Sequence, residues 1–86
     1  MKIDLFKIIK DNNYEIEESN SNGLNICNYD NEITIKGDKT DLIDLANYIV
    51  NIALSDNDSD HIHLDELTII DNNSEIKNLI IEKTSK

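Results

Sequence analysis

Two histidines separated by a single residue are the most chemically distinctive feature of this chain. His61 and His63 are its only histidines, and they alternate with apolar residues in a pattern that favours a β-strand. Because residues two apart in a strand point to the same face, both imidazoles could bind a zinc or nickel ion together with Asp60 or Asp65. Two histidines supply only half of a tetrahedral site, so a pair on the solvated face of a sheet is the simpler interpretation. The alternative to that simpler interpretation is a metal-responsive binding module that uses the two histidines and the neighbouring aspartates.

The segment before the histidines begins like a calcium-binding loop. Asp56, Asp58 and Asp60 place carboxylates at positions one, three and five of a twelve-residue loop. The rest of the segment does not match a calcium-binding loop, because His61 stands where a sharp turn needs glycine and Leu67 stands where a bidentate glutamate should close the site. We therefore interpret the segment as an acidic, solvated loop and expect neither a bound metal nor another cofactor.

Cys27 with His61 or His63 is the only pair of a thiol and an imidazole base that the sequence offers for nucleophilic catalysis. Cys27, the single cysteine, falls at an outward position of a predicted strand, with no helix N-terminus or glycine turn to activate it. Glycine-rich phosphate loops are absent from the sequence. We expect that the protein is not an enzyme. A lone cysteine cannot form an internal disulfide, which favours a reducing compartment and predicts a cytoplasmic protein.

Charge points to a protein partner. The 86 residues hold 18 acids and eight lysines but no arginine, and the formal net charge of -10 argues against nucleic-acid binding by phosphate neutralisation. Five of the acids and no lysine lie between residues 56 and 66, which predicts either an ordinary solvated surface or a surface that binds a basic partner protein. The residues expected to contact such a partner are Asp56, Asp58, Asp60, His61, His63, Asp65 and Glu66.

The apolar content predicts a folded chain with a core. Isoleucine, leucine and valine make up 25 of the 86 residues, which is too many for a disordered chain. With no proline and only two glycines, the 24 asparagines and aspartates must make nearly all turns and helix caps. The N-terminus interrupts its apolar residues with Asp4 and Lys7, so it resembles neither a signal peptide nor a membrane span.

One helix is predicted from about Lys39 to Leu54, where apolar residues recur at spacings of three and four. Asp38 is a suitable N-cap, and Asp41 stands three residues later at the capping-box position. The face opposite the apolar stripe carries Asp44, Asn47 and Asn51.

The remaining apolar pattern predicts strands. A hairpin is expected from Leu24 to Ile35 around a turn at residues 28 to 31, and further strands at residues 61 to 64 and 79 to 81. Residues 3 to 9 fit a strand or a short helix, and the strand is favoured because residues 14 to 18 could pair with it. Residues 67 to 70 form another apolar run before a turn at residues 71 to 74. We thus predict a single α+β domain over residues 1–86, with a mostly antiparallel sheet of five to six strands and one amphipathic helix on one face.

Several short motifs add a family resemblance. They are Gly37-Asp38, Leu42, Leu45-Ala46, His61-Ile62-His63-Leu64-Asp65, Ser74 and Leu79-Ile80-Ile81. In these motifs the chain resembles the immunity protein 32 family, small bacterial immunity proteins of polymorphic toxin systems, over roughly residues 24 to 83. The resemblance implies a hairpin, one helix, a His-x-His-Leu-Asp-like strand and a final strand. Leu64 is most simply a core residue and Ser74 a turn residue.

The same resemblance implies a function. Such a protein would be a non-catalytic inhibitor, made in the cytoplasm alongside a cognate toxin and blocking it by steric or electrostatic occlusion, with no catalytic residue to assign. A structural subunit that forms a homodimer through an exposed strand edge or sheet face is a further alternative.

Overall fold

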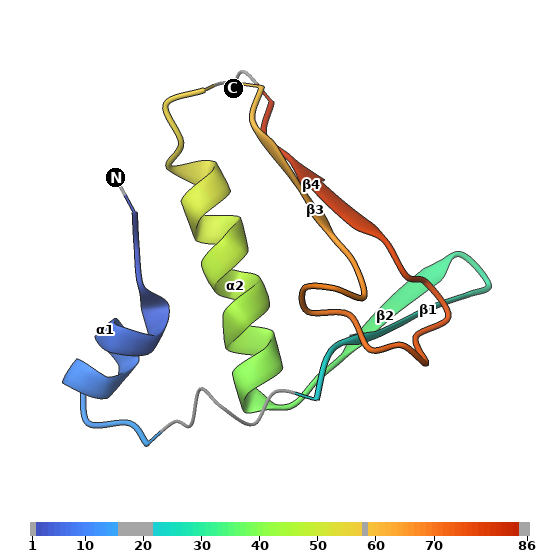
Figure 1. The fold of residues 1–86 in the computed structure, drawn as a ribbon, viewed down its shortest axis with the longest axis horizontal. Coiled ribbons are helices and arrows are strands. Elements are labelled where there is room, and N and C mark those ends of the chain that lie inside the picture. Colours follow the sequence, from blue (N-terminus) through green and yellow to red (C-terminus); the bar gives the residue numbers. More distant parts are fainter. Residues whose placement is uncertain (1, 16–21, 58, 85–86) are drawn as a thin grey trace.

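A computed structural model of the chain describes residues 2–15, 22–57 and 59–84. Its elements, in order, are α1 (Leu5–Asp11), β1 (Asn25–Tyr29), β2 (Glu32–Lys36), α2 (Lys39–Ala53), β3 (His61–Leu64) and β4 (Leu79–Glu82). Helix α2 lies between α1 on one side and the β3–β4 hairpin on the other, and the β1–β2 hairpin projects from the N-terminal end of α2 (Figure 1). The predicted α+β class is confirmed, whereas the predicted arrangement of strands is wrong.

Helix α2 begins and ends where the sequence predicts. The Asp38 carboxylate accepts a hydrogen bond from the Asp41 N–H at 2.8 Å, and the Asp41 carboxylate accepts one from the Asp38 N–H at 3.3 Å, so the capping box is complete. Asp41 is buried and also accepts a hydrogen bond from the Gly23 N–H at 3.0 Å. The cap therefore joins the helix to the segment that enters β1.

The N-terminal segment is a helix, so the predicted strand over residues 3 to 9 is wrong. Asp4 caps α1 by accepting a hydrogen bond from the Lys7 N–H at 3.2 Å. The side-chain oxygens of Asn47 and Asn51 on α2 accept hydrogen bonds from the Leu5 N–H and the Ile3 N–H at 2.9 and 2.7 Å. These amides satisfy N–H groups that a strand partner would otherwise bind. The polar face of α2 is thus the docking face for a second helix, and residues 16–18 of the predicted pairing segment lie outside the described residues.

The strands form two separate hairpins. β1 and β2 are antiparallel with Ile26 opposite Ile35, and β3 and β4 are antiparallel with Leu64 opposite Leu79. Asp30 and Asn31 close the first hairpin with φ angles of 50° and 67°, which indicates the two-residue turn that matches the strand twist. Each described sheet therefore has two strands, in place of the one sheet of five to six strands that was expected.

An irregular segment takes the place of a third strand beside β1. The Leu24 N–H donates to the Ile69 carbonyl at 2.6 Å and the Asp71 N–H donates to the Leu24 carbonyl at 2.9 Å, which makes one isolated parallel bridge. Further along, the Ser74 hydroxyl accepts a hydrogen bond from the Ile26 N–H at 2.8 Å. A side chain supplies the acceptor that a neighbouring strand would supply, so the sheet does not continue. The predicted turn at residues 71 to 74 is confirmed, because the Ser74 N–H donates to the Asp71 carbonyl at 3.0 Å. The Ser74 side chain is 2% exposed and also links this turn to β1, which the sequence did not predict.

The core lies where α2, both hairpins and the irregular segment meet. Its buried residues are Leu24, Ile26, Leu45, Leu64, Ile69 and Ile70, with Tyr48, Ile62, Ile76, Leu79 and Ile81 packed against them. The expectation that Leu64 belongs to the core is confirmed. Because α2 covers one face of the β3–β4 hairpin, the other face is left to solvent.

Candidate partner-binding surface

The histidines lie on the uncovered face of the β3–β4 hairpin. Ile62 and Leu64 point toward the core, whereas His61 and His63 are exposed, as the alternation of a strand requires. Across the hairpin, Glu82 lies opposite His61 and Ile80 lies opposite His63. We call these four residues, His61, His63, Ile80 and Glu82, the outer hairpin face.

The centre of this face combines aromatic and apolar surface. The two imidazole rings are 5.2 Å apart between centroids and meet edge to face at 74°. Ile80 is 56% exposed beside them. The predicted placement of both histidines on one face of a strand is confirmed, and the sequence pattern did not single out Ile80 as part of that face.

The acidic loop that precedes β3 is ordered by one of its own carboxylates. Asp60 accepts hydrogen bonds from the Ser55 hydroxyl at 2.8 Å and from the His61 N–H at 2.9 Å. The Lys83 ammonium donates to the Ser55 carbonyl at 2.7 Å, which ties the loop to the segment after β4. Asp56 is exposed to solvent, and Asp58 lies outside the described residues.

The other acids lie beyond the far end of β3. The Asp65 carboxylate accepts a hydrogen bond from the Leu67 N–H at 2.9 Å, and the Asp65 N–H donates to the Thr68 hydroxyl at 2.7 Å. Glu66 forms an ion pair with Lys77 at 3.8 Å between nitrogen and oxygen. Leu67, in the same turn, is 93% exposed, which a run of apolar residues gave no reason to expect.

The predicted acidic surface is thus divided between the two ends of β3. The four residues of β3, a strand about 13 Å long at ~3.3 Å per residue, lie between the two groups of carboxylates. The histidines occupy the space between them, and Lys83 and Lys77 each lie against one end. The surface is therefore an aromatic and apolar centre with acidic ends, less negative than the sequence between residues 56 and 66 suggests by itself.

The geometry offers little to a metal ion. Within the described part of the chain, no three histidine, cysteine, aspartate or glutamate side chains lie close enough together to hold one. The Asp60 and Asp65 carboxylates, which the metal hypothesis would use, accept hydrogen bonds within their own loops. Cys27 lies in β1 of the other sheet, away from the strand that carries both histidines.

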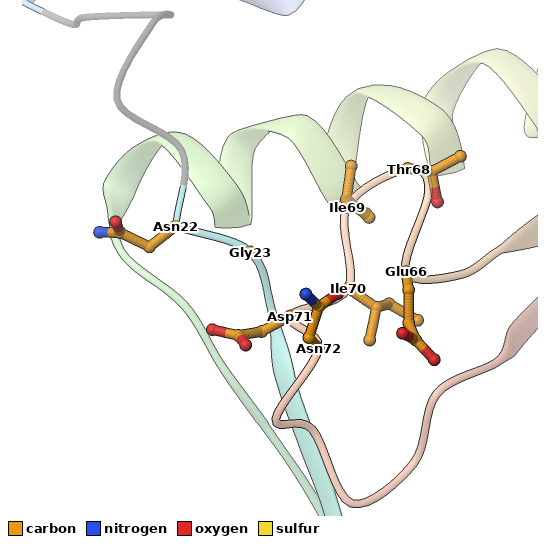
Figure 2. Close-up of a pocket in the computed structure, with 8 residues that line it drawn as sticks. All are labelled: Asn22, Gly23, Glu66, Thr68, Ile69, Ile70, Asp71 and Asn72. Atoms are coloured by element: carbon orange, nitrogen blue, oxygen red, sulfur yellow. The ribbon is translucent and has the colours of Figure 1, made fainter.

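A shallow hollow of about 350 Å³ lies between the entrance to β1 and the turn after β3 (Figure 2). Its lining is mostly polar, and the carboxylates of Glu66 and Asp71 point in different directions, so they do not converge on a common ligand. At its edge Gly23 has a φ of 90°, and a Cβ there would lie 2.9 Å from the Asp71 nitrogen. Gly23 thus allows two backbone segments to approach closely beside the hollow, and the hollow itself lacks the apolar walls that enclose most small ligands.

Neither helix in the described part of the chain has the length and apolar character needed to cross a membrane.

Comparison with known proteins adds a family. A family model described as immunity protein 32 matches residues 32–84, which include β2, α2, β3 and β4. No curated protein and no solved structure matched the chain. The match covers 53 of the 86 residues, more than half of the chain, and includes the whole outer hairpin face. The resemblance seen in the short motifs is confirmed, and the chain belongs to the immunity protein 32 family.

Proposed function

We propose that this protein is a non-catalytic immunity protein that binds a cognate toxin and neutralises it in the cytoplasm of the cell that makes both. Membership of the immunity protein 32 family is the observation that carries the proposal. The single, half-buried Cys27 is consistent with a reducing compartment.

The outer hairpin face and its acidic ends are the proposed binding surface. Protein interfaces commonly have a desolvated centre that is rich in aromatic and apolar groups and a polar rim. His61, His63 and Ile80 would form the centre. The rim would comprise Asp56, Asp60, Asp65, Glu66 and Glu82. A partner that fits this surface would present an apolar or aromatic group surrounded by lysine or arginine side chains.

Electrostatic attraction would make capture fast. A net charge of -10 attracts a basic partner over distances up to the Debye length, about 8 Å at physiological salt. Rim charges act mainly on the association rate, whereas groups in the desolvated centre act mainly on dissociation. Occupation of the toxin surface is sufficient for neutralisation, so no chemical step on the immunity protein is required.

Binding and rescue experiments with the toxin encoded beside this protein test the proposal. Co-expression should protect the host cell, and the two proteins should copurify. A complex that never forms, together with no rescue, would contradict the proposed function.

A pair of charge-reversed variants tests the surface separately. Asp56→Lys with Glu66→Lys should slow association at least about tenfold at low salt. Asp11→Lys with Glu15→Lys is the matched control, because each double variant changes the net charge from -10 to -6 and removes one weak ion pair, Glu66–Lys77 or Lys7–Asp11. Equal slowing by both pairs would show that only net charge matters and would exclude this surface.

A further inference from the structure

The outer edge of β2 carries backbone groups that no described residue binds. The N–H groups of Leu24, just before β1, and of Ile26 and Asn28 in β1 are hydrogen-bonded to the segment of residues 69–75, on the side away from β2. Backbone groups alternate in direction along a strand, so the N–H and C=O groups of Asn25, Cys27 and Tyr29 point toward β2. The partners of these three residues on β2 are Lys36, Thr34 and Glu32. The N–H and C=O groups of Ile33 and Ile35 therefore point away from the hairpin.

This edge is apolar in its middle and charged at its ends. All five residues of β2 are exposed, including Ile33 at 66% and Ile35 at 38%. Exposed strand edges readily pair with another strand unless they are short, bulged or charged in the middle. β2 has its charges only at its ends, a glutamate at residue 32 and a lysine at residue 36.

We propose that the outer edge of β2 pairs with the same edge of a second copy of this chain, antiparallel about a two-fold axis at Thr34. In this register Glu32 lies opposite Lys36 of the second copy, and Lys36 lies opposite Glu32 of the second copy. Ile33 lies opposite Ile35 of the second copy, and the reverse pair forms as well. The sequence of β2, Glu-Ile-Thr-Ile-Lys, is thus complementary to itself in both charge and apolar character.

The backbone favours the same register. Ile33 and Ile35 are the residues whose backbone groups point outward, so pairing one with the other across the axis makes four intermolecular hydrogen bonds. A shift of the axis to Ile35 would place Glu32 opposite Asp38 of the second copy, where like charges repel. A shift to Ile33 would place Lys36 beyond the strand, opposite the Asp30 turn. The axis at Thr34 satisfies hydrogen bonds, apolar contacts and charges together.

The product is a four-stranded sheet in which the two β2 strands are central. Ile26, Ile33 and Ile35 lie on one face of the hairpin, so their counterparts in the second copy would extend that apolar face across the axis. An interface this short belongs to the weak class, and we expect a dissociation constant in the micromolar range or above. The inference does not depend on toxin binding.

Sedimentation equilibrium across a concentration series tests the dimer. The wild-type protein should dimerise reversibly. Glu32→Lys and Lys36→Glu should each weaken dimerisation at least about tenfold, because like charges then meet twice across the axis. An equimolar mixture of these two variants should associate again, since each lysine faces a glutamate, and the double variant should dimerise like the wild type.

Two further variants separate the edge from other causes. Ile35→Pro removes an outward N–H group without breaking a bond to β1 and should abolish the dimer while the far-UV circular dichroism is retained. Glu15→Lys gives the same net charge as Glu32→Lys, -8 in place of -10, and should leave the dimer intact. The proposal would be overturned if the wild-type protein were a monomer at every concentration, or if the β2 variants left the dissociation constant of the dimer unchanged. Protection of the Ile33 and Ile35 amides from hydrogen exchange only when the toxin is added would also overturn it, because that result would assign the edge to that partner.

Discussion

Ser74 and Ile26 are 48 residues apart in sequence and share a buried hydrogen bond of 2.8 Å, from the Ile26 N–H to the Ser74 hydroxyl oxygen. The single hydroxyl proton of Ser74 faces two carbonyl oxygens, those of Ile26 and Ile76. Ile76 in turn donates its N–H to the Ile26 carbonyl at 2.9 Å. One small side chain therefore completes the backbone hydrogen bonding of β1 in the middle of the core.

Replacing this hydroxyl should be costly for stability. Ser74→Ala leaves the Ile26 N–H buried without an acceptor, and an unsatisfied buried group costs about 1–3 kcal/mol. We expect the free energy of unfolding, measured by urea denaturation, to fall by about 2 kcal/mol. The same change at the exposed Ser59 should alter stability by less than about 0.5 kcal/mol. Equal effects of the two variants would show that the link to Ile26 contributes nothing specific.

The elements that the sequence predicts correctly are those with local signals. Asp38 and Asp41 lie three residues apart and form the cap of α2 between themselves, so periodicity and capping together define the helix. Asp30 and Asn31 tolerate positive φ and close the first hairpin without any distant contact. Local chemistry was sufficient in both places.

The errors lie where distant groups decide the outcome. Ile3, Leu5 and Ile9 fit the period of a strand, whereas Ile3, Phe6 and Ile9 fit that of a helix. The helix α1 forms because Asn47 and Asn51, more than 40 residues away, bind its N-terminal end. The expected larger sheet fails because the Ser74 hydroxyl, and not a strand, binds β1. No pattern within a short window reports such long-range contacts.

The candidate surface was predictable in part for the same reason. The alternation at residues 61 to 64 was sufficient to place His61 and His63 on one face. The position of Lys77 beside Glu66 depends on the return of the chain toward β4. The placement of the acids at the two ends of β3 depends on the turns on either side of the strand. Ile80 could have been found once β4 was aligned with β3, because it lies opposite His63.

The docking of α1 should depend strongly on the Asn51 amide, which makes two of the hydrogen bonds to the N-terminal segment. Asn51 accepts a hydrogen bond from the Ile3 N–H at 2.7 Å and donates one to the Ile3 carbonyl at 2.9 Å. A helix of seven residues is too short to be stable alone, so Asn51→Ala should release it. We expect faster hydrogen exchange at residues 3–11 and a loss of about 1 kcal/mol in the free energy of unfolding. Asn78→Ala, at an exposed position, is the control, and unchanged exchange in Asn51→Ala would contradict the assigned role.

Asp44 on α2 should make stability depend on pH. Partial burial, and secondly the negative charge of Asp41, raise the pKa of Asp44 above its ordinary value of 3.8. The folded state therefore binds a proton on Asp44 more tightly than the unfolded state does. As the pH rises from below 3.8 through the folded-state pKa, this group loses its proton and its contribution to stability falls. Near neutral pH the ionised carboxylate opposes folding.

Asp44→Asn removes the ionised carboxylate that opposes folding near neutral pH, and it keeps nearly the same side-chain shape and helix propensity. The variant should have a higher Tm than the wild type at pH 7, and the difference should shrink as the pH falls and vanish below about 3.8. Thermal unfolding followed by circular dichroism from pH 3 to pH 7 measures it. Asp56→Asn, at an exposed position, is the matched control and should follow the wild type. A gain in Tm that persisted unchanged at pH 3 would assign the effect to packing, because both side chains are then neutral.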